Sequence, residues 1–246
     1  MNTTSTPSAS PNPRADAGLS RRGRLVIDAP MRAFHWLFAL SFAGAWLTAE
    51  SERWRSVHVT LGYAFGGLLV FRLAYGLLGP RPARLSLLWH RAAGLGEWLR
   101  QARAGHLDAS RTATLAMGLA MGLLLAMAAP LVLSGYAGYA EVFGLAEVFE
   151  EVHEALANAA LGLVLAHLAL ILLGSLMRGR NLAGPMLTGR MPGAGADVIK
   201  ANRRWLALLV VVAWLGFVGT QLAQPATDVA GASRGGHHGG HPADDD

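Results

Sequence analysis

Four of the nine histidines lie within long apolar stretches of the sequence: His35, His58, His153 and His167. An ionisable side chain at membrane depth is costly, so its presence there favours a functional role. Considered singly, each histidine could equally be a hydrogen-bonded packing residue near the end of a helix. Their spacing taken together favours a shared role.

This spacing predicts two pairs of histidines at two depths. His153 and His167 are fourteen residues apart, which is about 21 Å of rise and close to four full turns of an α-helix. Both imidazoles therefore project from one helix face. Because successive membrane helices run in opposite directions, His58 matches the depth of His153 and His35 matches that of His167. Histidines that face each other across a helical bundle can bind a heme iron on both axial sides.

Arg72 is a further candidate, because it follows His58 by fourteen residues and so shares its helix face at the depth of the inner pair. A buried arginine in lipid needs an anionic partner, and a heme propionate would form a charge-assisted pair with it. Alternatively, the side chain extends to the inner lipid headgroups. We favour the propionate role.

The composition indicates that lipid surrounds these residues. Hydrophobic residues make up 52% of the 246 residues and charged residues 15%, against about 25% charged residues in soluble domains. The sequence contains no cysteine, which excludes disulfides, iron–sulfur clusters and covalently attached heme within this chain. A redox metal would have to be held by histidine, methionine, carboxylate or another noncovalent contact.

Five apolar segments are long enough to cross a hydrocarbon core, which takes about 20 helical residues. We therefore expect an all-α protein with five membrane-spanning helices. The segments cover residues 33–50, 57–79, 112–134, 152–177 and 205–223.

Arginine placement predicts the orientation of these helices. Arginine and lysine concentrate in residues 14–32, 81–111 and 178–204, whereas residues 135–151 contain four glutamates and neither lysine nor arginine. Cytoplasmic loops carry the excess of basic residues in membrane proteins. The N-terminus is therefore expected on the cytoplasmic side of the bacterial inner membrane and the C-terminus on the periplasmic side. The same distribution argues against a nucleic-acid surface, despite the net charge of +5.

Two polar segments flank the first two apolar stretches. Residues 1–26 begin with many Ser, Thr, Pro and Asn residues, a composition typical of disorder, and predict a disordered cytoplasmic N-terminus. The connection 80–111 is amphipathic and is expected to lie along the inner membrane surface, with Trp89 and Trp98 at headgroup level.

The remaining histidines receive no heme role. His90 and His106 lie in the cytoplasmic connection and are expected to be solvated. Residues 224–246 form a glycine-rich segment that we expect to be a flexible periplasmic tail. Its imidazoles and carboxylates could bind a divalent metal, but their setting favours a mobile chain. These side chains are His237, His238, His241, Asp244, Asp245 and Asp246.

Around and between the four apolar histidines stand the motifs FHW, VHVTLGY, FRLAYGLLGP, VHEALAN, AHL, RNL and MLTGR. Together they resemble the prokaryotic cytochrome b561 family, nearest to the branch that includes the cytochrome b subunits of nickel–iron hydrogenases. The resemblance covers about residues 27–191. It implies a four-helix heme-binding transmembrane bundle with two noncovalent b hemes, whose ligands correspond to His35, His58, His153 and His167.

The resemblance has limits. Residues 192–223, the connector and the fifth helix, lie outside it. Members of this branch often have a His-Asn-Pro element before the third helix, where this chain reads GHLDAS. We therefore assign no role to His106, which lies in that stretch.

The resemblance implies that the chain is an electron-transfer subunit. It could be part of a quinone-linked oxidoreductase. Family members pass electrons between the quinone pool and a periplasmic or membrane partner, such as a c-type cytochrome or a hydrogenase. Quinone is thus a candidate second cofactor, and Glu154 beside His153 a candidate for proton handling. Two alternatives stay open: a transporter or channel subunit that uses intramembrane histidines, and a membrane anchor for a periplasmic enzyme.

Overall fold

The chain folds mainly into helices, as the computed structural model shows for residues 23–80, 83–106, 108–193 and 195–223. Six helices are long: α2 (Ala29–Thr48), α3 (Arg55–Leu78), α4 (Ser86–Arg103), α5 (Ala109–Tyr139), α6 (Ala146–Arg178) and α8 (Arg204–Ala223). The short elements are β1 (Arg24–Leu25), η1 (Glu52–Trp54), η3 (Val142–Gly144), α7 (Gly184–Thr188) and β2 (Arg190–Met191).

Four helices in the described part of the chain are long and apolar enough to cross a membrane, which confirms the prediction of an all-α membrane protein. They are Glu52–Leu78, Arg111–Tyr139, Ala146–Arg178 and Arg204–Ala223. Helix α2, the first of the five expected spans, has 20 residues but is not among these candidates. Its hydropathy is lowered by Arg32 and His35 near its start.

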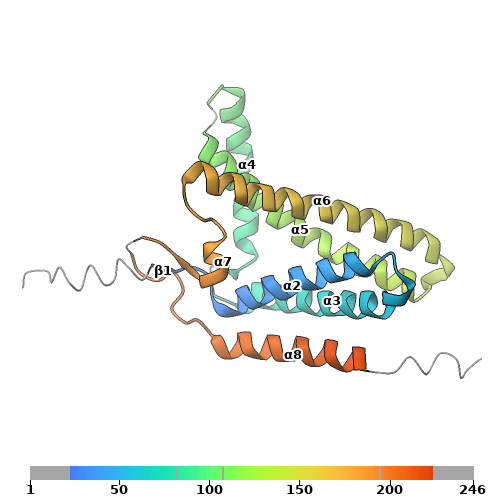
Figure 1. Cartoon of the computed structure of the whole chain (residues 1–246). Helices are drawn as coiled ribbons and strands as arrows, with labels where there is room; N and C mark the ends of the chain where they lie inside the picture. The colour runs from blue at the N-terminus through green and yellow to red at the C-terminus, as the bar shows by residue number, and fades with distance from the viewer. Residues whose placement is uncertain (1–22, 81–82, 107, 194, 224–246) are drawn as a thin grey trace, which may run out of the picture.

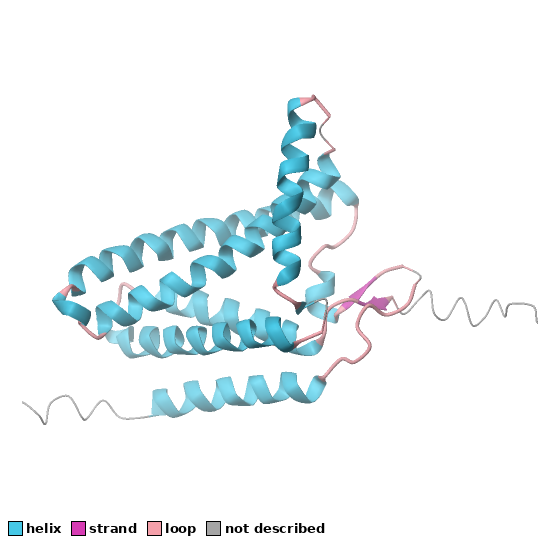
Figure 2. Cartoon of the chain, turned by 180° about the vertical axis from the view of Figure 1, so that it is seen from behind, coloured by secondary structure: helices cyan, strands magenta, loops and turns pink. Residues whose placement is uncertain are grey.

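The long helices other than α4 lie side by side in layers (Figure 1). Helices α5 and α6 form an antiparallel pair joined through η3, and α2 and α3 form a second pair joined through η1. Helix α8 lies on the far side of the second pair from α5 and α6, as the view from behind also shows (Figure 2). The pair α2–α3 is therefore the central layer.

The layers are joined by two apolar clusters. Phe65 of α3 belongs to the first, where it packs with Ala128 of α5 and Ala160 of α6. Small residues such as these alanines let helix backbones approach closely in lipid. Phe38 of α2 stacks on Phe65 with ring centroids 3.8 Å apart. The cluster thus holds both helix pairs together at the middle of the bundle.

The second cluster attaches α8 to the central layer. Val210 is buried among Phe34 and Leu37 of α2 and Leu68 of α3. One turn along, Trp214 Nε1 donates a 2.9 Å hydrogen bond to the hydroxyl of Ser41, which is fully buried. Helix α8 is therefore packed into the bundle through both apolar and polar contacts.

At the end of the bundle that carries His35, which we call the inner end, a buried polar junction joins three helices. Asp28 is completely buried and caps α2 by accepting a hydrogen bond from the Met31 amide. The Tyr75 hydroxyl of α3 donates to the same carboxylate. Arg203, just before α8, lies 3.9 Å from it. One side chain thereby fixes the inner ends of α2, α3 and α8 relative to each other.

The segment before α2 is ordered from residue 24 onward, although residues 24–26 were expected to belong to a disordered terminus. Strand β1 pairs with β2 in antiparallel register, Arg24 opposite Met191. The amides of Val26 and Ile27 both donate to the Gly189 carbonyl, at 2.8 and 3.1 Å. The backbone after α7 supplies these partners, and a sequence pattern of two residues per strand is too short to reveal them.

Helix α4 runs across the direction of the other long helices (Figure 1); its position along a membrane surface stays a prediction. Trp98 Nε1 donates a 2.9 Å hydrogen bond to Thr112 of α5, so this indole binds a neighbouring helix. The side chains of Trp89 and His90 lie outside the described residues, as does the histidine- and aspartate-containing tail.

We expect Asp28→Ala to destabilise the protein by about 2–4 kcal/mol, because it removes a helix cap and leaves a buried tyrosine and an arginine without their carboxylate. Thermal unfolding in detergent measures this. Glu147→Ala, which removes an exposed carboxylate from the first turn of α6, is the control and should change the midpoint little. An unchanged midpoint for Asp28→Ala would contradict the structural role of the junction.

Candidate functional site

The outer histidines face each other between α3 and α6. The ring centroids of His58 and His153 lie 6.1 Å apart, with the ring planes at 85°. A metal–imidazole bond is about 2.0–2.1 Å long, so two imidazoles on opposite sides of one metal have ring centroids about 6 Å apart. The observed separation fits a single metal between the two rings.

Hydrogen bonds fix the tautomer of both outer imidazoles. His58 Nδ1 lies 2.8 Å from the Ala45 carbonyl, and His153 Nδ1 lies 3.0 Å from the Leu131 carbonyl. A carbonyl oxygen can only accept, so each Nδ1 carries the proton. The lone pair is then on Nε2, where a metal can bind it, and such a second hydrogen bond is the usual companion of a metal-bound histidine.

The end of α2 explains why Ala45 can serve as acceptor. Its carbonyl is one of the last four of α2, which have no partner within a regular helix. The amide of Ala49 turns back to Trp46 instead, at 3.3 Å. The Thr48 hydroxyl donates to the Gly44 carbonyl at 2.7 Å and also lies 3.1 Å from the Ala45 carbonyl.

A glycine lets the His153 ring lie against the backbone of α5. A Cβ atom at Gly135 would be 2.8 Å from His153 Cε1 and 2.9 Å from its Nδ1, closer than packed atoms tolerate. The neighbouring Ser134 hydroxyl donates to the Leu131 carbonyl at 3.1 Å and lies 3.4 Å from His153 Nδ1. Helix α5 carries no histidine, yet it orients this one.

The inner histidines are also brought together, though with fewer supporting contacts. His35 of α2 and His167 of α6 are near enough for their imidazoles to interact electrostatically. His167 Nδ1 is buried and has no hydrogen-bond partner; among the described residues only Arg32 Nε shares this state. Arg32 lies one turn before His35, so both unpartnered nitrogens belong to the inner level.

An apolar layer separates the two levels. Phe38 follows His35 by one helix turn, and Phe65 follows His58 by two. Their stacked rings belong to the first apolar cluster. The histidine levels are therefore distinct sites rather than one cluster of four imidazoles.

Arg72 is buried on α3 and donates a 3.1 Å hydrogen bond to the Ala83 carbonyl, beyond the inner end of the helix. Within the described residues, no carboxylate forms an ion pair with it. The side chain thus points toward the inner end. Both roles considered for Arg72, binding a heme propionate and reaching the lipid headgroups, require this direction.

Sequence reasoning missed the polar junction and the carbonyl acceptors. The DAP sequence at Asp28 is a signal for a helix start, with a capping aspartate and proline in the first turn. It could have identified the cap but not the partners Tyr75 and Arg203. The acceptors at Ala45 and Leu131 are backbone atoms, which leave no residue-type signal.

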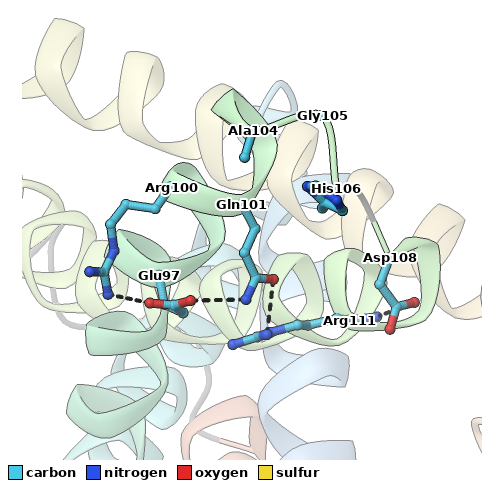
Figure 3. Close-up of a pocket in the computed structure, with 8 residues that line it drawn as sticks. All are labelled: Glu97, Arg100, Gln101, Ala104, Gly105, His106, Asp108 and Arg111. Atoms are coloured by element: carbon cyan, nitrogen blue, oxygen red, sulfur yellow. Dashed lines mark hydrogen bonds and ion pairs between the residues drawn. The ribbon is translucent and has the colours of Figure 1, made fainter.

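A surface hollow at the turn between α4 and α5 is separate from the histidine pairs and is lined by polar side chains (Figure 3). Glu97 accepts hydrogen bonds from Arg100 and Gln101, and Gln101 accepts one from Arg111 at 3.0 Å. These polar groups bind each other. His106 lines the hollow and is exposed, as expected for a solvated histidine.

Comparison with known proteins places these residues in a family. The family model described as prokaryotic cytochrome b561 matches residues 26–189, more than half of the 246 residues, and includes all four histidines and Arg72. A search of curated proteins and a search of solved structures each found no match. The matched region ends at α7, so α8 lies outside it. Members of the matched family are membrane cytochromes that bind heme b and transfer electrons. This chain belongs to the prokaryotic cytochrome b561 family.

Proposed function

We propose that this protein is a diheme b-type cytochrome of the bacterial inner membrane. It relays electrons between the quinone pool and a periplasmic or membrane redox partner, a c-type cytochrome or a hydrogenase-like enzyme. The observation that carries the proposal is the outer pair, His58 and His153. Their 6.1 Å separation and their carbonyl-bound Nδ1 atoms suit axial ligation of one iron.

In this proposal each histidine has one role. His58 and His153 bind the outer heme, and His35 and His167 bind the inner one, so α6 contributes a ligand to each. The hemes supply one-electron chemistry. The protein would bind them without covalent bonds, orient the two outer imidazoles through hydrogen bonds and pack the Phe38–Phe65 layer between the two levels.

Arg72 is proposed to bind a propionate of the inner heme. Its burial and its direction toward the inner end of α3 support this role. A guanidinium has five N–H donors, so the bond to the Ala83 carbonyl leaves donors for a carboxylate.

A groove on the inner half of α6 supports quinone as a second cofactor. It is an open hollow of about 560 Å³ on the surface of the helix, starts one residue after His167 and has the exposed side chains of Leu168, Leu172 and Leu176 along its apolar side. Its inner end holds Arg180 and Asn181. An apolar wall that ends in hydrogen-bond donors suits an isoprenoid molecule with a polar ring.

The orientation in the membrane is proposed from charge. The outer turn between α5 and α6 has exposed glutamates, Glu141 and Glu147, and the opposite ends of these helices carry Arg111 and Arg178. Basic residues favour the cytoplasmic side. The segment before α2 is thus proposed to be cytoplasmic and the end of α8 periplasmic.

The purified protein is expected to contain two b hemes per chain. A pyridine hemochrome assay counts them, and a reduced-minus-oxidised spectrum identifies their type. Absence of Soret absorbance in protein isolated from heme-replete cells would overturn the proposal and favour a transporter or anchor.

Substitution of one ligand on α6 should remove one heme. His153→Ala should lose mainly the outer heme and His167→Ala mainly the inner one, each retaining about half of the heme absorbance. His106→Ala, a substitution of an exposed histidine, should retain both hemes. Full heme content in either ligand variant would exclude that histidine as a ligand.

Gly135→Ala should disturb the outer heme, because the added Cβ would lie 2.8 Å from the His153 ring. We expect loss or spectral change of one heme, measured by hemochrome and low-temperature difference spectra. Gly162→Ala is the matched control, since a Cβ there meets nothing within 4 Å in the described structure. If both variants show the same wild-type spectra, the His153 ring does not depend on α5.

A further inference from the structure

Helix α8 lies outside the region that the family model matches, yet it is packed against α2, which carries His35. It lies beside the α2–α3 pair, on the side away from α5 and α6 (Figure 1). Helix α2 packs most closely against α3 and α8, and much less against α6. The placement of His35 relative to His167 of α6 therefore depends on how α3 and α8 hold α2.

Polar contacts attach the segment before α8 to the start of α2. The Ala29 amide donates a 2.8 Å hydrogen bond to the side-chain oxygen of Asn202. Arg203 lies 3.9 Å from the Asp28 carboxylate, which is completely buried. The first amides of a helix have no partner within that helix, so Asn202 satisfies the N-terminus of α2 from outside.

Farther along, α8 contacts one face of α2. Val210 is buried among Phe34 and Leu37. Trp214 Nε1 donates a 2.9 Å hydrogen bond to the hydroxyl of Ser41. The contacting residues advance in the same direction along both helices, so the two helices run parallel. Helix α8 thus touches α2 on both sides of the inner histidine.

The face of α2 that contacts α8 determines where its neighbouring face points. The same spacing of three and four residues, displaced by one position, gives His35, Phe38 and Phe42. Phe38 and Phe42 pack against the first apolar cluster, which includes Ala160 of α6. One residue corresponds to about 100° of rotation about the helix axis. When α2 lies with one face on α8, His35 is therefore turned toward the bundle interior.

We propose that α8 is a positioning helix for the inner site, whose contacts hold α2 at the rotation that directs His35 toward His167. This inference rests on the proposed heme function and concerns a helix outside the matched family region. Rotating α2 by about 20° would move a group about 6 Å from its axis by about 2 Å. That displacement is about the length of a metal–imidazole bond, so a small rotation is enough to disturb ligation.

The inner site depends on helix placement because its rings have few partners of their own. His167 Nδ1 is buried without a hydrogen-bond partner. The ring of His35 lies in a T-shaped arrangement with Trp36, with centroids 5.5 Å apart. The outer ligands are carried by α3 and α6, and α2 contributes only the Ala45 carbonyl to them. A change in the rotation of α2 should therefore disturb the inner site more than the outer one.

Two mild substitutions on α8 test this role without altering α2 or any histidine. Trp214→Phe keeps an aromatic ring but removes the N–H group that binds Ser41. Val210→Ala removes two methyl groups from the second apolar cluster. The matched controls are Trp205→Phe and Val212→Ala on the same helix, since both of these side chains are exposed.

The experiment is electron paramagnetic resonance of the oxidised full-length protein in detergent, with heme content measured by hemochrome. The low-spin ferric signal reports how the two axial imidazoles are oriented relative to each other. His153→Ala and His167→Ala identify the inner and outer signals by the one that each retains. Trp214→Phe and Val210→Ala should shift the inner signal or reduce its intensity, with the outer signal little changed, whereas both controls should match the wild type.

An unchanged inner signal in both variants would overturn the inference. So would an equal change at both sites, which is the result expected of a helix that only stabilises the protein. Absence of heme in the wild type would instead overturn the proposed function. As a second measurement, Ser41→Ala removes the same hydrogen bond from α2 and should shift the same signal as Trp214→Phe. The double variant should resemble either single variant, and an additive change would contradict the role of this bond.

Discussion

A histidine inside a membrane helix has two ring nitrogens to satisfy and no water nearby to do so. In this protein the outer histidines meet that requirement through the backbone of other helices. The end of α2 offers the Ala45 carbonyl to His58, and α5 offers the Leu131 carbonyl to His153. Each ring then keeps its remaining lone pair on Nε2, with the two ring centroids 6.1 Å apart, and α2, α3, α5 and α6 all take part in one site.

The two ends of the bundle are stabilised in different ways. At the outer level, short turns and carbonyls orient the imidazoles. At the inner level, the rings have few direct partners, but α2, which carries His35, is held at its start by Asp28 and by the pairing of β1 with β2. Rigid helix ends and loosely bonded rings can coexist, because Asp28 lies two turns before His35 and acts on the helix as a whole. The protein thus positions its inner histidines mainly through helix placement.

The positions of the histidines could be predicted from the sequence because helical rise and periodicity fix the relation between residues fourteen apart. The family motifs taken together predicted that these helices form a bundle. Their hydrogen-bond partners could not be predicted, since Ala45 and Leu131 contribute main-chain atoms. The junction at Asp28 depends on Arg203, which is distant in sequence and has a left-handed φ of 40°. For α2, helix formation was predictable, but Arg32 and His35 lower its hydropathy below that of the other spans.

The contacts of α8 bear on how the protein is assembled during synthesis. This helix follows the histidine-bearing helices along the chain, so the ribosome produces Asp28 and Ser41 well before Arg203 and Trp214. Until α8 enters the bilayer, the bundle has a buried carboxylate without its arginine and a serine hydroxyl without its indole. Lateral docking of α8 then satisfies both groups together. Helix α8 therefore completes polar contacts at the start and middle of α2, which is made much earlier along the chain.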